Sequence, residues 1–539
     1  MESTFLPLDY IILVGYFLLI FGVAFWTSIK EKSTANTENY FLGGKNIGWF
    51  VIGASLFASN IGSEHLVGLA GQGASSGIAA AQFEILAVFM LLILGWVFVP
   101  FYLKSGVFTM PEFLEKRYNA GARYYLSIIS IVAYVLTKIS VTIFAGAVIF
   151  EALLGIDFWT GAFIIVIATG VYTVFGGLRA VVYTDLVQMF ILLGGAIAVT
   201  AIGLHKVGGW NVMYETVNPG MMSLWKPASD PNYPWTGILF GAPILGIWYW
   251  CTDQFIVQRV LSSKDISNAR RSTIFAGFLK LTPLFLFLLP GVLAFVLAKQ
   301  GQIVLENPDY ALGVMINSLL PTGLKGLVAA GLLAALMSSL SSVFNSCSTL
   351  FTLDLYQKFV PGKEDKHYVR IGQLATVVLV LLGLAWIPFV NTIGNSGLFK
   401  SLQSIQAYIS PPIAAVFLFG LLSKKVNGKG AIAALAIGGI LGAIRLVLEV
   451  LYPEGAGLSG VLFSYVTINF LYMAIILFVI STIVLFAVSI SSGESNSEEA
   501  NKLTFTYGET NWSEITKSKE FILSMILVVC VFIIWIYFR

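Results

Sequence analysis

Charged residues are scarce in this sequence. Asp, Glu, Lys and Arg together make up 11% of the 539 residues, whereas hydrophobic residues make up 57%. A water-soluble protein normally carries about 25% charged residues, so the composition excludes a chain of soluble domains. Apolar segments recur from residue 8 to residue 538. We therefore predict a multi-pass integral membrane protein whose solvent is the lipid bilayer.

Cysteine and histidine are also rare, with three of each. The cysteines show no Cys-X-X-Cys spacing, which argues against a zinc site or a disulfide framework. The net charge of +3 leaves no basic patch for nucleic acid. No nucleophile, base and orienting group stand together along the chain, as an enzyme would require. We therefore predict a protein that is not an enzyme, that binds no nucleic acid and for which no obligate protein partner is evident.

The apolar segments divide into lengths that fit a membrane, since a spanning helix needs about 20 apolar residues. The first segment lacks the basic flank of a secretory signal peptide and is interpreted as a mature span. Interruptions by Pro, Gly and charge predict fourteen spans, at 8–27, 47–72, 77–103, 122–153, 158–175, 180–205, 236–258, 272–298, 323–357, 369–391, 397–422, 430–452, 461–489 and 520–538.

The distribution of positive charge predicts the orientation of these spans. If the N-terminus is outside, the loops that face the cytoplasm hold 22 of the 31 Lys and Arg residues, and the opposite loops with the C-terminus hold five. Positive residues resist translocation across the membrane. The asymmetry therefore predicts that both termini lie outside.

Two predicted spans are interrupted by small and polar residues. The second contains the run 58–65, and the seventh contains the run 241–254, which holds Pro243. With the first span set aside, these are the first helices of two five-helix halves, and matching broken helices indicate a secondary transporter with inverted repeats. Small residues also allow close helix packing, but packing alone does not explain Asn60 and Asp253, since polar and ionisable groups in hydrocarbon are costly and usually functional.

The ninth span carries a face of small and hydroxyl residues, formed by Ala335, Ser338, Ser339 and Ser342. Sodium is a hard cation that binds several oxygens, and hydroxyls with carbonyls can replace its hydration shell. Serines in membrane helices also bond to their own backbone or bridge helices. The pattern alone leaves both interpretations open, and its combination with a broken helix favours ion binding.

Several polar groups stand isolated in long apolar runs. A sugar presents a ring of hydroxyls and an apolar ring face, so its site needs mixed polar partners and an aromatic surface. A buried Glu84–Lys280 ion pair that only holds helices together is the alternative. The residues that would supply a sugar site are Asn60, His65, Glu84, Lys280, Gln403, Tyr249 and Trp250.

Three long motifs resemble those of the sodium/solute symporter family. They are GASLFASNIGS at 53–63, FGGLRAVVYTD at 175–185 and WYWCTDQ at 248–254. Shorter matches, such as PPIAAVF at 411–417, extend the likeness over nearly the whole chain. Within the family, the sequence is most similar to the sodium/glucose (galactose) cotransporter branch.

The resemblance implies an all-α membrane protein of 14 transmembrane helices. The fold would be a leucine-transporter-type 5+5 inverted repeat, with the first and sixth core helices broken. It divides the chain into an extra N-terminal helix (8–27), the first five-helix repeat (47–205), the second repeat (236–422) and three C-terminal helices (430–538).

The same resemblance implies roles for individual residues. The matched sugar-binding positions are Asn60, His65, Glu84, Tyr249, Trp250, Lys280 and Gln403. The matched outer gate comprises Leu69, Phe83 and Phe399, and the inner gate is Tyr249. The main sodium site would comprise the carbonyls of Ala58, Ile61 and Ala335 with the hydroxyls of Ser338 and Ser339, and a second sodium site would comprise Asp185, Ser338, Ser341 and Ser342.

The implied function is sodium-coupled symport of a hexose by alternating access, with sodium as the co-transported ion and two sodium ions per sugar. Gly246 stands where related transporters place a polar residue near the sugar, so the preferred sugar stays open. Myo-inositol, a monocarboxylate or sialic acid are alternative substrates. A passive channel would need a continuous polar lining instead of isolated polar groups. Short extracellular loops favour a bacterial inner membrane.

Overall fold

Helices make up nearly all the regular structure of this protein. The computed structural model describes residues 5–31, 36–62, 64–390, 398–505 and 512–539. Within these ranges, β pairing is limited to two isolated bridges, Ile47 with Ser263 and Lys226 with Pro234. Eleven of the described helices are long and apolar enough to cross a membrane. The prediction of an all-α multi-pass membrane protein is therefore confirmed.

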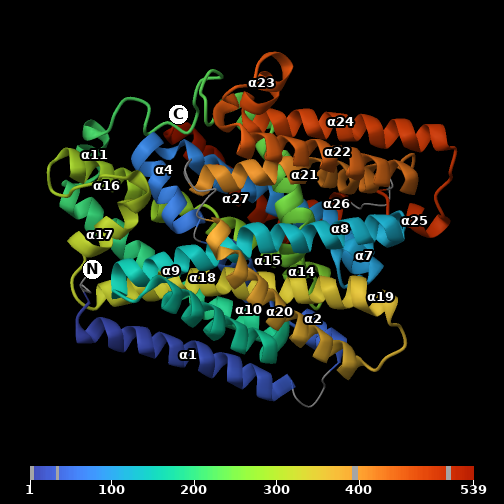
Figure 1. Cartoon of the computed structure of the whole chain (residues 1–539), viewed down its shortest axis with the longest axis horizontal. Helices are drawn as coiled ribbons and strands as arrows, with labels where there is room; N and C mark the ends of the chain where they lie inside the picture. Colours follow the sequence, from blue (N-terminus) through green and yellow to red (C-terminus); the bar gives the residue numbers. More distant parts are fainter. Residues whose placement is uncertain (1–4, 32–35, 63, 391–397, 506–511) are drawn as a thin grey trace.

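Most helices follow one another with short connections, whereas residues 217–234 form a long loop between α11 and α12 (Figure 1). In chain order, with short π-helical segments labelled η, they are α1 (Pro7–Glu31), α2 (Thr37–Leu42), α3 (Trp49–Asn60), η3 (Glu64–Gly68), α4 (Leu69–Ser76), α5 (Gln82–Ile93), η5 (Leu94–Phe98), α6 (Val99–Ser105), α7 (Met110–Arg117), α8 (Ala120–Ala133), η6 (Tyr134–Ile139), α9 (Ser140–Leu154), α10 (Phe158–Val207), α11 (Trp210–Thr216), α12 (Trp235–Phe240), α13 (Ala242–Gly246), η7 (Ile247–Thr252), α14 (Gln254–Leu261), α15 (Ile266–Leu279), η8 (Leu284–Leu288), α16 (Leu289–Lys299), α17 (Ala311–Leu319), α18 (Leu324–Thr349), η10 (Leu350–Tyr356), α19 (Gln357–Phe359), α20 (Asp365–Val390), α21 (Leu398–Leu422), α22 (Gly428–Leu451), α23 (Gly460–Thr467), α24 (Phe470–Ser492), α25 (Glu498–Lys502), α26 (Trp512–Lys517) and α27 (Lys519–Tyr537).

Three features account for the difference between fourteen predicted spans and eleven long helices. The predicted second and seventh spans are each divided into shorter helical pieces. The predicted fifth and sixth spans both lie within α10, a 50-residue element in which two helices meet at a kink at Gly177, in the gap between the two predicted spans. Gly177 bends this element with a φ of +56°, and a Cβ there would lie 2.6 Å from the carbonyl oxygen of Tyr40. Only glycine suits that position.

One predicted span has a different boundary. The segment 461–489 was expected to be a single helix, but it forms α23 and α24 with a break between them. Ile468 is extended, with ψ of 138°, and the Asn469 side chain caps α24 by accepting the Leu471 N–H at 2.9 Å. Asn is a favoured N-cap residue, so the helix begins there.

The first interrupted span comprises α3, η3 and the start of α4. The helix α3 ends at Asn60, and Ile61 has the extended backbone of ψ 99° before η3 begins at Glu64. The last carbonyls of α3 therefore lack intrahelical partners, as at any helix end. This break places backbone oxygens beside α18, which packs against α3.

The second interrupted span consists of α12, α13, η7 and α14. Pro243 lies in the first turn of α13, and η7 follows with π-helical geometry. Asp253 is extended, with ψ of 129°, and α14 begins after it. π-Helical segments are frequent at functional sites, and this one carries Tyr249 and Trp250.

The helix α18 lies at the centre of the protein, with nearly all of its residues buried. It packs against α10, α1 and α3, and α1 runs along one edge of the bundle (Figure 1). The helices α21, α22 and α24 pack on one another on the opposite side. Both termini lie toward the same end of the long helices (Figure 1).

Candidate functional site

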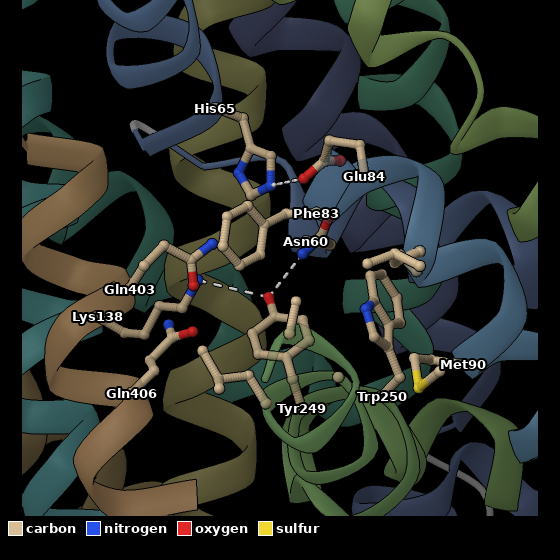
Figure 2. Close-up of a pocket in the computed structure, with 15 residues that line it drawn as sticks. Asn60, His65, Phe83, Glu84, Met90, Lys138, Tyr249, Trp250, Gln403 and Gln406 are labelled. Atoms are coloured by element: carbon tan, nitrogen blue, oxygen red, sulfur yellow. Dashed lines mark hydrogen bonds and ion pairs between the residues drawn. The ribbon is translucent and has the colours of Figure 1, made fainter. Parts of the chain in front are cut away.

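A polar cavity lies where the two interrupted spans meet α5 and α21 (Figure 2). Apolar and aromatic side chains line it together with a few polar groups, as in other small-molecule sites. Six of the seven predicted sugar-binding residues line it. The lining residues are Asn60, His65, Phe83, Glu84, Leu86, Ala87, Met90, Lys138, Ala242, Leu245, Gly246, Tyr249, Trp250, Gln403 and Gln406.

A charged network forms one wall of the cavity. His65 Nε2 lies 3.1 Å from Glu84 Oε1. Lys280, the seventh predicted residue, follows α15 and contacts both Glu84 Oε2 and Asn60 Oδ1 from behind the lining. Glu84 is 4% exposed and Lys280 is 1% exposed, and a charge at such depth is stable only when it is paired. Through these contacts, Lys280 holds the Glu84 carboxylate and the Asn60 amide at the edge of the cavity.

The aromatic rings of Tyr249 and Trp250 line the cavity next to this network, as Figure 2 shows. The Tyr249 hydroxyl accepts a hydrogen bond of 2.7 Å from Asn60 Nδ2, and the Lys280 ammonium lies 5.1 Å from the centre of the Trp250 ring. Tyr249 also lines a second, smaller cavity that reaches Tyr134 and Asp253. Lys138 and Gln406 also line both cavities, so these three side chains together stand between them.

Two polar residues that line this cavity were not predicted from the sequence. Lys138, from η6, lies 3.5 Å from the Tyr249 hydroxyl, and Gln406 lies one turn after Gln403 on α21. A charged residue inside a predicted span was an available signal for Lys138. The spacing of three residues from Gln403 was the signal for Gln406.

The predicted gate residues differ in position. Phe83 lines the cavity and stacks on Phe470, with ring centres 6.4 Å apart. Leu69 is fully buried in α4 and does not line the cavity. The side chain of Phe399 lies outside the described residues.

Gly246 is closely approached by Met90. A Cβ on Gly246 would lie 2.6 Å from Met90 Cγ and 3.1 Å from its sulfur. The methionine therefore fills the space that a larger residue at position 246 would take. Methionine side chains are flexible and fill irregular spaces in apolar cores. Here Met90 bounds the end of the cavity near Trp250.

The predicted main sodium site lies between the end of α3 and the middle of α18. The Ser339 hydroxyl donates to the carbonyl oxygens of Ser59, at 3.0 Å, and of Ile61, at 3.3 Å. Ala58 precedes this break within α3, and Ala335 lies one turn before Ser339. Ser59 was not among the predicted ligands. These hydroxyl and carbonyl oxygens suit a hard monovalent cation.

The residues predicted for a second sodium site are brought only partly together. The Ser338 hydroxyl donates to Asp185 Oδ1 at 2.6 Å, whereas the Ser341 hydroxyl donates to the Ser338 carbonyl at 3.0 Å. Ser342 contacts the guanidinium of Arg259, which also lies 3.4 Å from Asp185 Oδ2. Arg259 was not among the residues predicted for this site.

This arrangement defines a class of protein, because interrupted helices around a polar cavity are the architecture of secondary transporters. Residues 40–438 match the model of the sodium:solute symporter family. The chain is 40% identical over 520 residues to sodium/glucose cotransporter 1 of Ovis aries, covering 89% of this chain and 78% of that protein. It is 38% identical over 542 residues to sodium/glucose cotransporter 2 of Rattus norvegicus, covering 93% and 81%.

The fold also matches a solved structure, the substrate-bound outward-open state of a sodium-coupled sialic acid symporter. The TM-score is 0.76 at 21% identity, covering 91% of this chain and 99% of that one. The chain belongs to the sodium:solute symporter family. It is a sodium-coupled multi-pass transporter and not an enzyme, as the sequence predicted.

Proposed function

We propose that this protein is a symporter that couples the entry of sodium to the uptake of a hexose of the glucose or galactose class by alternating access. The observation that carries the proposal is the cavity that joins the Asn60–Lys280–Glu84–His65 network to two aromatic rings. Carboxylate, amide and imidazole groups bind ring hydroxyls. The Tyr249 and Trp250 rings would cover the apolar face of the sugar. The names of the sodium/glucose cotransporters support the same substrate class.

Other solutes of this family place different demands on the cavity. A monocarboxylate or sialic acid carries a carboxylate that requires a cation in the site. Lys280 contacts the carboxylate of Glu84 and the amide oxygen of Asn60, so its charge is already balanced. Lys138 also lines the cavity, 3.5 Å from the Tyr249 hydroxyl, and is the cation that such a carboxylate would meet. Myo-inositol has the hydroxyl pattern of a sugar without its ring oxygen and is the second candidate.

The wider architecture is proposed on the same basis. The two interrupted spans begin two five-helix inverted repeats, at 47–205 and 236–422, between an N-terminal helix at 8–27 and three C-terminal helices at 430–538. Together they make 14 passes, with both termini outside, in a bacterial inner membrane. The positions of both termini at one end of the long helices (Figure 1) and the charge asymmetry of the loops support this orientation.

Two sodium ions would drive each sugar. The first would bind Ala58, Ile61, Ala335, Ser338 and Ser339, and the second would bind Asp185 with Ser338, Ser341 and Ser342. Each sodium crossing 100 mV contributes about 2.3 kcal/mol, and a tenfold gradient adds about 1.4 kcal/mol. One ion would therefore sustain roughly a 500-fold sugar gradient, and two would sustain one on the order of 10⁵-fold.

The gates would close the cavity in turn. Tyr249 lines both the sugar cavity and the smaller cavity beside Asp253, together with Lys138 and Gln406, and its place between them supports its role as the inner gate. Phe83, with Leu69 and Phe399, would form the outer gate. Alternating access requires that one of these barriers opens while the other stays closed.

Uptake of labelled solutes into proteoliposomes tests the proposal. We expect glucose or galactose to accumulate with an inward sodium gradient and not with potassium in its place. Counterflow of labelled sugar should also occur, because a carrier exchanges its substrate and a pore does not. Preferred uptake of myo-inositol, a monocarboxylate or sialic acid from the same panel would overturn the substrate class.

A further inference from the structure

The Arg259 side chain is enclosed deep in the protein. It extends from α14, the helix that follows the second interruption, and it is fully buried. Its Nε donates to the Ser55 hydroxyl at 2.8 Å, and Nη2 lies 3.4 Å from Asp185 Oδ2 and contacts Ser342 Oγ. The guanidinium therefore bridges α3, α10 and α18.

These contacts coincide with the second sodium site of the proposed function. Asp185 and Ser342 are two of its four residues, and both hold the guanidinium. Ser55 links the two charges, since its hydroxyl also donates to Asp185 Oδ2. A sodium ion at these oxygens and the guanidinium would need the same acceptors.

Charge balance allows only one cation beside Asp185 at a time, either the Arg259 guanidinium or a sodium ion. Among the described residues, the other side chains that bond to Asp185 are those of Ser55 and Ser338, which are uncharged. One carboxylate thus balances one cation. A second cation would leave an unbalanced positive charge in a fully buried site, which is costly.

The position of Arg259 also gives the guanidinium a route away from the site. The chain is extended at Asp253, where η7 ends and α14 begins. Breaks of this kind act as hinges, because a few backbone torsions absorb the movement of the next helix. A movement of α14 would carry Arg259 away from Asp185 while α10 and α18 stay packed together.

We propose that Arg259 is a built-in competitor of sodium at Asp185, so that either the guanidinium or the second sodium ion occupies this site. The inference rests on the proposed function for the existence of that second ion. Sodium binds there when α14 withdraws Arg259. After sodium leaves, Arg259 returns and neutralises Asp185, which lets the empty carrier reset without a buried unpaired carboxylate. The residue is thus a positioning element of the coupling cycle.

Direct binding of ²²Na⁺ to purified protein without sugar tests this proposal, and it does not depend on which sugar is transported. A competitor that holds the site about nine-tenths of the time weakens the apparent sodium affinity about tenfold. We therefore expect Arg259→Gln to bind the second sodium about tenfold more tightly than the wild type. The first sodium, bound near Ser339, should keep its affinity. Arg445→Gln is the matched control, since Arg445 is also buried but bonds to the Tyr465 and Ile468 carbonyls.

Two further variants keep the test decisive if Arg259→Gln does not fold. Ser55→Ala removes the hydroxyl that anchors Nε and should tighten the second sodium several-fold, since Ser55 is not among the proposed ligands. Adding Asp185→Asn to Arg259→Gln should abolish the gain. Unchanged or weaker binding of the second ion in folded Arg259→Gln or Ser55→Ala would overturn the competition. A gain that survives Asp185→Asn would do the same. Failure of sugar uptake in the wild type would instead reject the substrate class alone.

Discussion

Replacing Glu84 by Gln distinguishes the two roles open to the Glu84–Lys280 pair. Glu84 contacts Lys280 through Oε2 and lies 3.1 Å from His65 through Oε1. Both partners of the pair are almost completely buried. Gln keeps the shape of the side chain but leaves the ammonium without a carboxylate. Breaking a buried pair in this way costs about 3–5 kcal/mol of unfolding free energy.

The same substitution should weaken sugar binding if the carboxylate accepts hydroxyls of the substrate. Loss of a charge-assisted hydrogen bond in a buried site costs about 1–3 kcal/mol, which corresponds to roughly 5- to 150-fold in dissociation constant. The assay is sugar binding at saturating sodium, with thermal unfolding of the purified protein in detergent measured in parallel. Glu115→Gln is a control, because its pair with Arg123 is partly exposed and lies outside the cavity.

The double variant Glu84→Gln with Lys280→Met separates stability from binding. Removing both charges leaves no unpaired ion, so most of the lost stability should return. Sugar affinity should stay low, because neither the carboxylate nor the ammonium is present. A stable double variant with wild-type sugar affinity would refute the reasoning and leave the pair a purely structural contact.

Three other outcomes follow from the site. In the double variant Ser338→Ala with Ser339→Ala, sodium-driven uptake should collapse, since alanine supplies no ligand oxygen; unchanged sodium-dependent uptake would reject this site. Asp185→Asn should lower the sodium-to-sugar ratio from two toward one, measured by paired fluxes or the reversal potential, and a wild-type ratio of one would remove the second site. Gly246→Asn should bind sugar poorly unless Met90→Ala makes room, because the new Cβ meets Met90 at 2.6 Å; equal affinities in the single and double variants would contradict this packing.

Local sequence signals were sufficient for much of the fold. Long apolar runs predicted the spans because the hydrocarbon core sets a minimum length for a helix. The breaks after Asn60 and at Asp253 were also visible, since small and polar residues interrupt an otherwise apolar run. The boundary between α23 and α24 was missed, because a single cap at Asn469 is a weaker signal than the surrounding hydrophobicity.

The inventory of the cavity could also be anticipated from the sequence. Buried polar residues in hydrocarbon are rare, so Asn60, His65 and Glu84 stood out by their positions alone. Their pattern did not say whether Glu84 and Lys280 face a substrate or only each other. The structure places Glu84 at the cavity and Lys280 behind it, and that distinction depends on how α5 packs against α15.

The sequence by itself determined three things: that this chain is an integral membrane protein, at which residues its helices are interrupted, and which residue types are available to bind sodium and sugar. Only the tertiary structure decided which of them meet. Arg259 is 74 residues from Asp185 along the chain, and Lys138 is 111 residues from Tyr249. No periodicity extends over such separations, because these contacts form only when whole helices pack together. The pairing of charges and the shape of the cavity are therefore properties of the packed bundle, whereas the spans and their breaks are properties of each segment.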